Sequence, residues 1–217
     1  MAEGPGGGYS APHMHTDLSP GANDQSFLAV SSAMTAIVVF TTTDGVLRDP
    51  ETGSCGEARE ALDLLATRAV PVVLMSQGDA ARVQALQREL GLDYPFICDG
   101  GASLYIPRGY FEELDGLTAG DEAWEIFQFG VRDPSRAVRL LASLYSVRGE
   151  EILTIGFGSR VEDSGLLTAV HVPIVVRQPD DDPMRLLRRV PSAYVTAAVG
   201  PAGWNEAVFG SAAAWTP

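Results

Sequence analysis

The chain has 217 residues, 46% of them hydrophobic and 20% charged, values typical of one soluble α/β domain with a tail. Its formal net charge is -13 and all 15 basic residues are arginine, so we expect neither nucleic acid nor membrane surfaces as partners. The two cysteines form no disulfide or metal-binding pattern, and no window approaches the roughly 18 apolar residues of a membrane span. These features predict a cytoplasmic protein.

Residues 1–33 are rich in Gly, Pro, Ser and Ala, contain no basic residue and show no sustained periodicity. Such a segment buries too little apolar area to offset the entropy lost on ordering. We therefore predict a flexible N-terminal tail over 1–33 and a folded core over 34–217.

Along the core, short apolar runs alternate with helical periodicity. The runs predict strands at 36–40, 70–75, 96–98, 103–106, 152–157 and 172–176. The periodic segments predict helices at 57–68, 79–90, 135–147, 166–170 and 204–209. The Asp-Gly-Gly turn at 99–101 predicts a β-hairpin between the third and fourth strands. This alternation is typical of a doubly wound α/β fold with a mainly parallel, Rossmann-like sheet.

Ligands of doubly wound sheets bind beyond the carboxyl ends of the strands, so the residues that follow each strand are candidate site residues. The first strand is followed by Thr42, Thr43, Asp44 and Gly45, and the second by Ser76, a residue that helix capping explains equally well. Further along lie two more motifs of this kind: Asp133-Pro134-Ser135-Arg136 before a helix, and Gly158-Ser159-Arg160-Val161-Glu162-Asp163 after a strand.

Together these motifs resemble the haloacid dehalogenase (HAD) superfamily. The segments 95–107 and 200–208 are similar to the mannosyl-3-phosphoglycerate phosphatase-like family in particular, and the likeness covers most of residues 34–210. The resemblance implies a HAD core. It also implies a cap domain between the hairpin and the third motif, but only 109–131 separates them here, which is room for a loop and perhaps a short helix.

The resemblance implies roles for the motif positions. In the family an aspartate at the place of Thr42 attacks phosphorus, and the one at the place of Asp44 handles the leaving-group proton. Ser76 matches the residue that hydrogen-bonds the phosphoryl group. Pro134 stands where a lysine is usual, and Arg136 or Arg132 is the candidate substitute for its charge, although either is also explained as a solvent-facing helix arginine.

The fourth motif of the family supplies metal-ligating acids. Ser159 stands at the first of these positions and Asp163 at the second, with Glu162 as a neighbouring acid. Magnesium prefers oxygen ligands that include one or two carboxylates, and replacing two of them by hydroxyls weakens such a site. We therefore expect no cofactor, or Mg²⁺ if the site is active.

These substitutions lead to three hypotheses. The first is a catalytically degenerate, capless HAD-like protein that serves as a binding or assembly subunit. The second is an active Mg²⁺-dependent phosphatase for a small phosphorylated sugar or glycerate compound, using Asp44 as nucleophile or acid and Arg136 as cation. The third is a metal-independent binder of phosphorylated ligands, with Ser76, the 42–45 backbone and an arginine forming an anion nest.

An aromatic-rich stretch at 121–130 suggests a protein partner. Trp124, Phe127 and Phe129 lie in the segment that replaces the cap. We predict a partner-binding surface formed by these residues together with the N-terminal tail. Local packing over the vacated site is the alternative explanation for the same residues.

Overall fold

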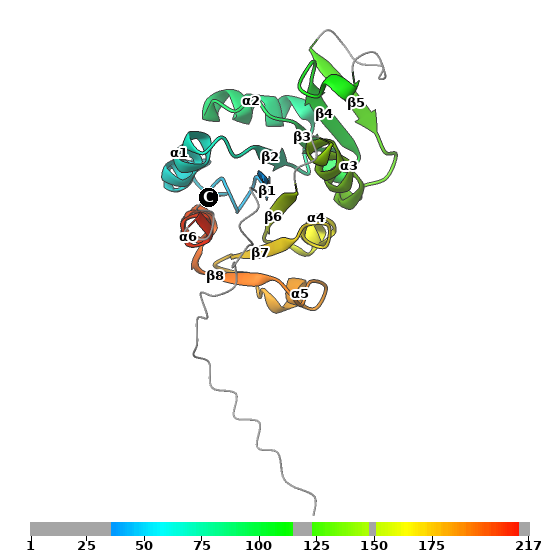
Figure 1. The fold of residues 1–217 in the computed structure, drawn as a ribbon. Coiled ribbons are helices and arrows are strands. Elements are labelled where there is room, and N and C mark those ends of the chain that lie inside the picture. Colours follow the sequence, from blue (N-terminus) through cyan, green and yellow to red (C-terminus); the bar gives the residue numbers. More distant parts are fainter. Residues whose placement is uncertain (1–35, 115–122, 148–150, 213–217) are drawn as a thin grey trace, which may run out of the picture.

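The computed structural model describes residues 36–114, 123–147 and 151–212. The predicted tail over 1–33 lies outside the described residues, as does 115–122 within the predicted 109–131 loop. The described residues form an eight-stranded sheet, ordered β5-β4-β3-β2-β1-β6-β7-β8, with helices on both faces (Figure 1). The predicted doubly wound α/β fold is therefore confirmed.

Six strands of this sheet run parallel: β1 (Ala36–Thr42), β2 (Val72–Met75), β3 (Phe96–Cys98), β6 (Ile152–Gly158), β7 (Val172–Arg177) and β8 (Tyr194–Val199). The other two, β4 (Ser103–Pro107) and β5 (Trp124–Gln128), extend it as an antiparallel meander from β3. Because the six parallel strands point the same way, the residues after them gather at one edge of the sheet.

The helices divide between the two faces. On one face lie α1 (Arg59–Thr67), α2 (Ala80–Leu90) and α6 (Gly200–Ala212), and on the other lie α3 (Pro134–Ser146), α4 (Ser164–Leu167) and α5 (Met184–Leu187) (Figure 1). Short 3-10 turns complete the described chain: η2 (Gly56–Ala58), η3 (Asp99–Gly101), η4 (Glu112–Leu114) and η5 (Val161–Asp163).

Most predicted elements are present, and the differences lie near the edges of the sheet. The prediction of a loop and perhaps a short helix in 109–131 missed a strand, because besides the short 3-10 helix η4 this segment contains β5, which pairs with β4 along its whole length. We also did not predict β8 or the four-residue helix α5, and α6 begins at Gly200 rather than at residue 204. Both missed strands are edge strands, whose pairing depends on a neighbour that local periodicity does not reveal.

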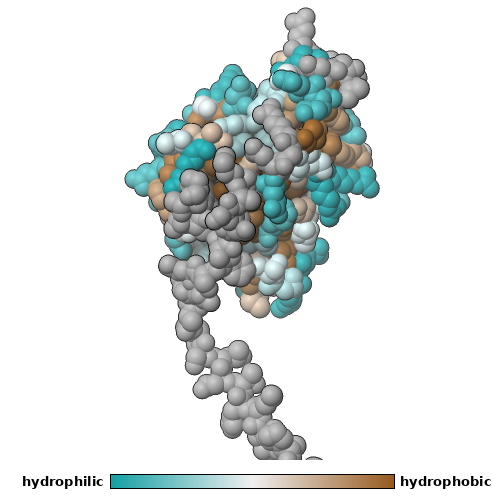
Figure 2. All heavy atoms as spheres, viewed as in Figure 1, coloured by the Kyte–Doolittle hydropathy of each residue, from teal (hydrophilic) through white to brown (hydrophobic). Residues whose placement is uncertain are grey.

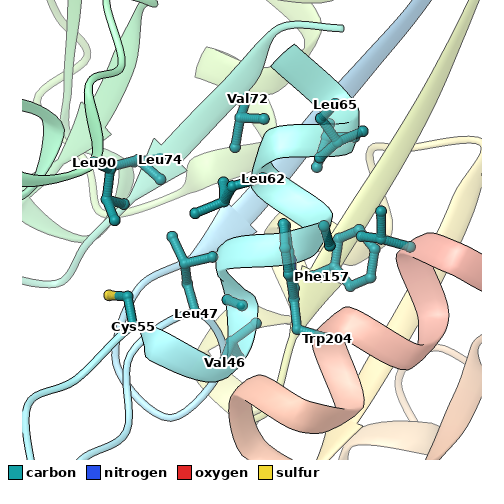
Figure 3. Packing of buried hydrophobic residues seen from close by; sticks show 14 of the residues in the cluster. Val46, Leu47, Cys55, Leu62, Leu65, Val72, Leu74, Leu90, Phe157 and Trp204 are labelled. Carbon is teal, nitrogen blue, oxygen red and sulfur yellow. The ribbon is translucent and has the colours of Figure 1, made fainter. Parts of the chain in front are cut away.

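The side chains of β1 alternate between two apolar cores. Val39 belongs to the core under α1, α2 and α6, where Phe157 of β6 and Trp204 of α6 also lie, with ring centroids 5.6 Å apart (Figure 3). Val38 and Phe40 belong to the second core, under α3, α4 and α5. A strand buried on both faces reads as a continuous apolar run, which explains why its sequence predicted it clearly.

Among the described residues no helix is long and apolar enough to cross a bilayer. Hydrophilic and hydrophobic residues are interspersed on the face shown in Figure 2, with apolar side chains visible where Figure 1 places β4, β5 and α3.

A close backbone contact positions the start of α3 against the turn after β3. Gly101 has a positive φ of 97°, and a Cβ atom there would lie 2.3 Å from the nitrogen of Pro134. Both partners at this point are backbone, so neither moves aside without shifting the helix. The contact holds the first turn of α3 near the carboxyl edge of the sheet.

We expect Gly101→Ala to lower the free energy of unfolding by about 3 kcal/mol, because it adds a backbone clash to the strain of a positive φ. The control is Gly109→Ala, which also has a positive φ but has open space around its Cβ position. The control should cost only about 1 kcal/mol, the strain alone. Urea unfolding of both variants measures the difference, and equal losses would contradict the proposed contact.

Candidate functional site

Strands β1, β2 and β6 end side by side at the carboxyl edge, and the predicted site residues follow them. Val39 to Thr42 pair with β2, and Ala36 to Thr41 pair with β6, so β1 lies between its two neighbours. Thr42 ends β1, Ser76 follows β2 and Ser159 follows β6. The structure therefore brings these three positions to one edge, as the sequence predicted.

Thr42 is buried and its hydroxyl faces the backbone. The side chain is 6% exposed, and Oγ1 donates to the carbonyl of Phe157 at 3.5 Å, a long hydrogen bond. A threonine hydroxyl attacks phosphorus only when a base removes its proton. No hydrogen bond from the Thr42 hydroxyl to a histidine or carboxylate is present among the described residues.

Asp44 is paired with an arginine that the sequence analysis did not single out. Nη2 of Arg82 donates to Oδ1 and Oδ2 of Asp44 at 3.0 and 3.1 Å. Arg82 lies in the first turn of α2, three residues after Asp79, which caps this helix by accepting from the Arg82 backbone N–H. A signal was present in the sequence, because the helix that follows Ser76 must begin at the same edge of the sheet.

Two backbone N–H groups of the turn after β1 already donate to carbonyl groups of the protein. The Thr43 N–H donates to the Met75 carbonyl, and the Gly45 N–H donates to the Arg48 carbonyl at 2.8 Å. From beyond β7, Nε2 of Gln178 donates to the Gly45 carbonyl. The anion nest predicted for the 42–45 backbone therefore lacks two of its N–H donors, at positions 43 and 45.

Ser76 keeps a donor available at the edge. It is 3% exposed, and its Oγ accepts a hydrogen bond from the Gly78 N–H at 3.0 Å. Helix capping does not explain this residue, because Asp79 caps α2. Since Oγ acts as an acceptor in this bond, its own hydrogen is free to donate to a ligand.

Asp163 is engaged as a local cap. Its Oδ2 accepts from the backbone N–H groups of Ser159 at 2.8 Å and Arg160 at 2.9 Å, and the residue is 5% exposed. Burial raises the pKa of this carboxyl above its ordinary value, against the lowering effect of the two N–H groups. The Ser159 hydroxyl is buried and has no hydrogen-bond partner among the residues that the structure describes.

The third motif places no arginine at the edge in contact with these residues. Pro134 is buried between Gly101 and Gly165, while Arg136 is exposed on α3. The described residues show no ion pair or hydrogen bond from the Arg136 side chain to Thr42 or Asp44. Cys98, at the end of β3, is not a nucleophile at neutral pH, because burial raises the pKa of its thiol to about 12.

A small hollow remains between the ends of β1 and β2 and the helix α2. It is lined by polar residues of the edge and by apolar residues of the inner face of α2: Thr43, Asp44, Arg48, Ser76, Arg82, Val83 and Leu86. Two arginines and one aspartate make its formal charge positive, although the chain carries -13 overall.

The aromatic residues of the predicted partner surface lie on both faces of β5. Trp124 packs edge-on against Phe96, with ring centroids 5.1 Å apart, in the core under α1, α2 and α6. Phe127 and Phe129 pack against the other core. The three side chains therefore do not form one continuous patch, and their role in partner binding stays a prediction.

Comparison with known proteins relates this chain to phosphatases by sequence. No family model matches the chain. A glucosyl-3-phosphoglycerate/mannosyl-3-phosphoglycerate phosphatase from Methanococcoides burtonii is 24% identical over 265 residues, spanning 79% of this chain and 96% of the relative. The protein of the same description from Persephonella marina is 34% identical over 74 residues, 34% of this chain and 28% of that protein.

Solved structures give the same fold. A HAD-superfamily phosphatase from Bacteroides thetaiotaomicron aligns with a TM-score of 0.58 at 12% identity, covering 85% of this chain and 98% of that one. The cobalt-bound deoxy-D-mannose-octulosonate 8-phosphate phosphatase of Haemophilus influenzae aligns with a TM-score of 0.55 at 16% identity, covering 84% and 90%. The chain has the HAD fold and resembles the mannosyl-3-phosphoglycerate phosphatases.

The alignment with the Methanococcoides phosphatase also bears on the cap domain that the resemblance predicts. It runs over 265 positions, whereas 79% of the 217 residues here is about 171, so roughly 90 positions have no counterpart in this chain. Between β4 and α3 this HAD-like chain has only residues 108–133. That interval contains β5 and η4 and is too short for a further domain.

The residues of the fourth motif do not fit a divalent cation. The described residues contain no group of three or more His, Cys, Asp or Glu side chains placed to hold a metal. Asp44 directs both oxygens at Arg82, and Asp163 directs Oδ2 at two backbone N–H groups. Mg²⁺ requires near-octahedral oxygen coordination, usually with carboxylates, and this donor set does not supply it.

If Asp163 is a structural cap, its loss should destabilise the protein in the absence of any metal. We expect Asp163→Ala to lower the free energy of unfolding by about 3 kcal/mol in EDTA, because two backbone N–H groups, one of them buried, lose their acceptor. Glu162→Ala, the exposed neighbour, is the control and should change stability by less than about 0.5 kcal/mol. A metal role predicts instead that Mg²⁺ stabilises the wild type and that EDTA removes the effect of the substitution.

Proposed function

We propose that this chain is a phosphatase homologue that has lost phosphoryl transfer and acts as a binding or assembly subunit. The observation that carries the proposal is the state of Asp44, the remaining first-motif acid, whose carboxylate is bonded to Arg82 through both oxygens. A carboxylate in this pair is a poor nucleophile, since the guanidinium stabilises its charge. In the described part of the chain, no base is hydrogen-bonded to the buried hydroxyl of Thr42.

Two further features support the loss of chemistry. Ser159 stands where the resemblance places a metal-ligating aspartate, and Asp163 is occupied as a backbone cap. The exposed Arg136 lies outside the hydrogen-bonded residues of the edge. Each of these changes alone is tolerable, but phosphoryl transfer in the family depends on nucleophile, cation and positive charge acting together.

An active Mg²⁺-dependent phosphatase is the second candidate, and the similarity to glucosyl-3-phosphoglycerate/mannosyl-3-phosphoglycerate phosphatases favours it. In that case a phosphorylated sugar or glycerate compound is the substrate, Asp44 is the nucleophile or acid, and Arg136 supplies positive charge. Thr42 and Ser76 then contact the phosphoryl group. This candidate requires Arg82 to release Asp44 before the reaction.

A phosphatase assay separates the two candidates. We expect the purified chain, with Mg²⁺, to hydrolyse mannosyl-3-phosphoglycerate, glucosyl-3-phosphoglycerate and an aryl phosphate at rates at least about a thousandfold below the Methanococcoides enzyme, because the nucleophile position is a buried threonine. Asp44→Ala and the exposed control Asp63→Ala should then behave alike. Turnover that Asp44→Ala abolishes and Asp63→Ala preserves would establish the active candidate.

The binding role predicts a complex that depends on the region of β5. We expect Trp124→Ala and deletion of residues 1–33 each to reduce recovery of a specific protein complex in a pull-down with the full chain as bait. Tyr194→Ala, a 45% exposed aromatic on the opposite edge strand β8, is the control. Thermal unfolding of each variant measures how far the protein is destabilised, including by the loss of Trp124 packing against Phe96. If neither change reduces recovery of the complex, Trp124 serves packing alone. The expected cytoplasmic location stays a prediction.

A further inference from the structure

The sheet ends at β8, beside α5, with an edge that carries no charge (Figure 1). The six residues of this strand, Tyr194–Val199, include neither a charged residue nor a proline, two of the devices that commonly protect an edge strand. The opposite edge strand, β5, directs the buried Glu125 inward, where Arg108 pairs with it. Of the two edges, β8 is therefore the one suited to contact with another chain.

Exposed apolar side chains gather around this edge. Among the described residues six large hydrophobic side chains are strongly exposed, and four of them lie on β8 or on the helices α5 and α6 that precede and follow it: Met184, Tyr194, Val199 and Phe209. Phe209 lies one helical turn after Glu206, whose carboxylate reaches β8, so both side chains are on the same face of α6. Apolar surface concentrated in one place is typical of a contact with another protein.

The backbone of β8 is already bonded in its second half. The carboxylate of Glu206 accepts from the N–H groups of Ala197 at 3.2 Å and Ala198 at 2.7 Å. These two N–H groups are not available to a further strand, which would need them for its own ladder. A partner therefore contacts this edge mainly through side chains of β8, α5 and α6.

The connection from β7 to β8 carries two runs of opposite charge. It begins at the carboxyl edge of the sheet with the acidic residues Asp180 and Asp181, and it ends at the amino edge, with Arg188 and Arg189 in its second half. All four side chains are exposed, and the described residues show no ion pair from any of them. Both runs are therefore available to opposite charges on a partner.

We propose that a second copy of this chain binds at the β8 edge, with the two copies of β8 antiparallel about a two-fold axis and the two copies of α5 on the same side of the sheet. The axis reverses one copy relative to the other, so the acidic run of each copy lies opposite the arginine run of its partner. This contact occurs twice, and the exposed apolar side chains around β8 are removed from water. The surface is separate from the β5 region used in the proposed function, so the two contacts form independently.

Reversing the charge of either run should weaken self-association. The double variant Arg188→Glu with Arg189→Glu places acids opposite acids, and Asp180→Arg with Asp181→Arg places arginines opposite arginines. We expect each double variant to weaken the dimer by about tenfold or more, because like charges then face each other at both contacts. Sedimentation velocity of the full-length chain over a wide range of concentrations measures the dissociation constant.

A mixture of the two double variants tests the two-fold arrangement. In a mixed pair the introduced arginines of one chain lie opposite the introduced glutamates of the other, and the remaining native runs also meet as opposite charges. The mixture should therefore recover the dimer that neither variant forms alone. Recovery also shows that both variants are folded.

A matched control separates this surface from the effect of net charge. Arg59→Glu with Arg88→Glu changes two exposed arginines of α1 and α2, alters the net charge by the same amount as the arginine-run variant, and should leave the dimer unchanged. A wild-type chain that sediments as a monomer throughout, a control that weakens the dimer equally, or a mixture that does not recover it overturns the proposal. A monomer that dimerises only when residues 1–33 are deleted overturns it as well, because the N-terminal segment then occupies the edge.

Discussion

The burial of β1 between β2 and β6 is the constraint on which the rest of the structure depends. Its backbone is paired on both sides, and its side chains enter both apolar cores, with Val39 in one and Phe40 in the other. A strand held on two edges and two faces has a single register, because a shift by one residue would exchange the cores. The end of β1, and with it Thr42, is therefore placed precisely at the carboxyl edge.

This placement keeps the outline of a phosphatase site at the carboxyl edge of the sheet. Side chains that resemble phosphatase motifs still meet at the edge, but their interactions are internal. Asp44 pairs with Arg82, Asp163 caps two backbone N–H groups, and Gln178 donates to the turn after β1. Buried polar groups require partners, and other groups of the protein supply most of them here. Among the described residues, the buried Ser159 hydroxyl has no hydrogen-bond partner.

The interval in which the family resemblance predicts a cap lies at the far edge of the sheet. In place of a further domain, the chain adds β5 to β4, and Glu125 of β5 is buried with Arg108 at 2.7 Å from its Oε1. A charge directed inward on an edge strand disfavours pairing with another chain at that edge. Strand β5 thus extends the sheet and limits its open edge at the same time.

The sequence by itself determined the central strands, the main helices and the positions of Thr42 and Ser159 after two of these strands. Those features depend on local periodicity and on motif residues that are close together in the chain. Only the tertiary structure decided that Arg82 meets Asp44, that Asp163 acts as a cap and that β5 and β8 join the sheet. Each of these depends on the direction of a side chain or on pairing between distant segments, and the packing of the whole sheet sets both.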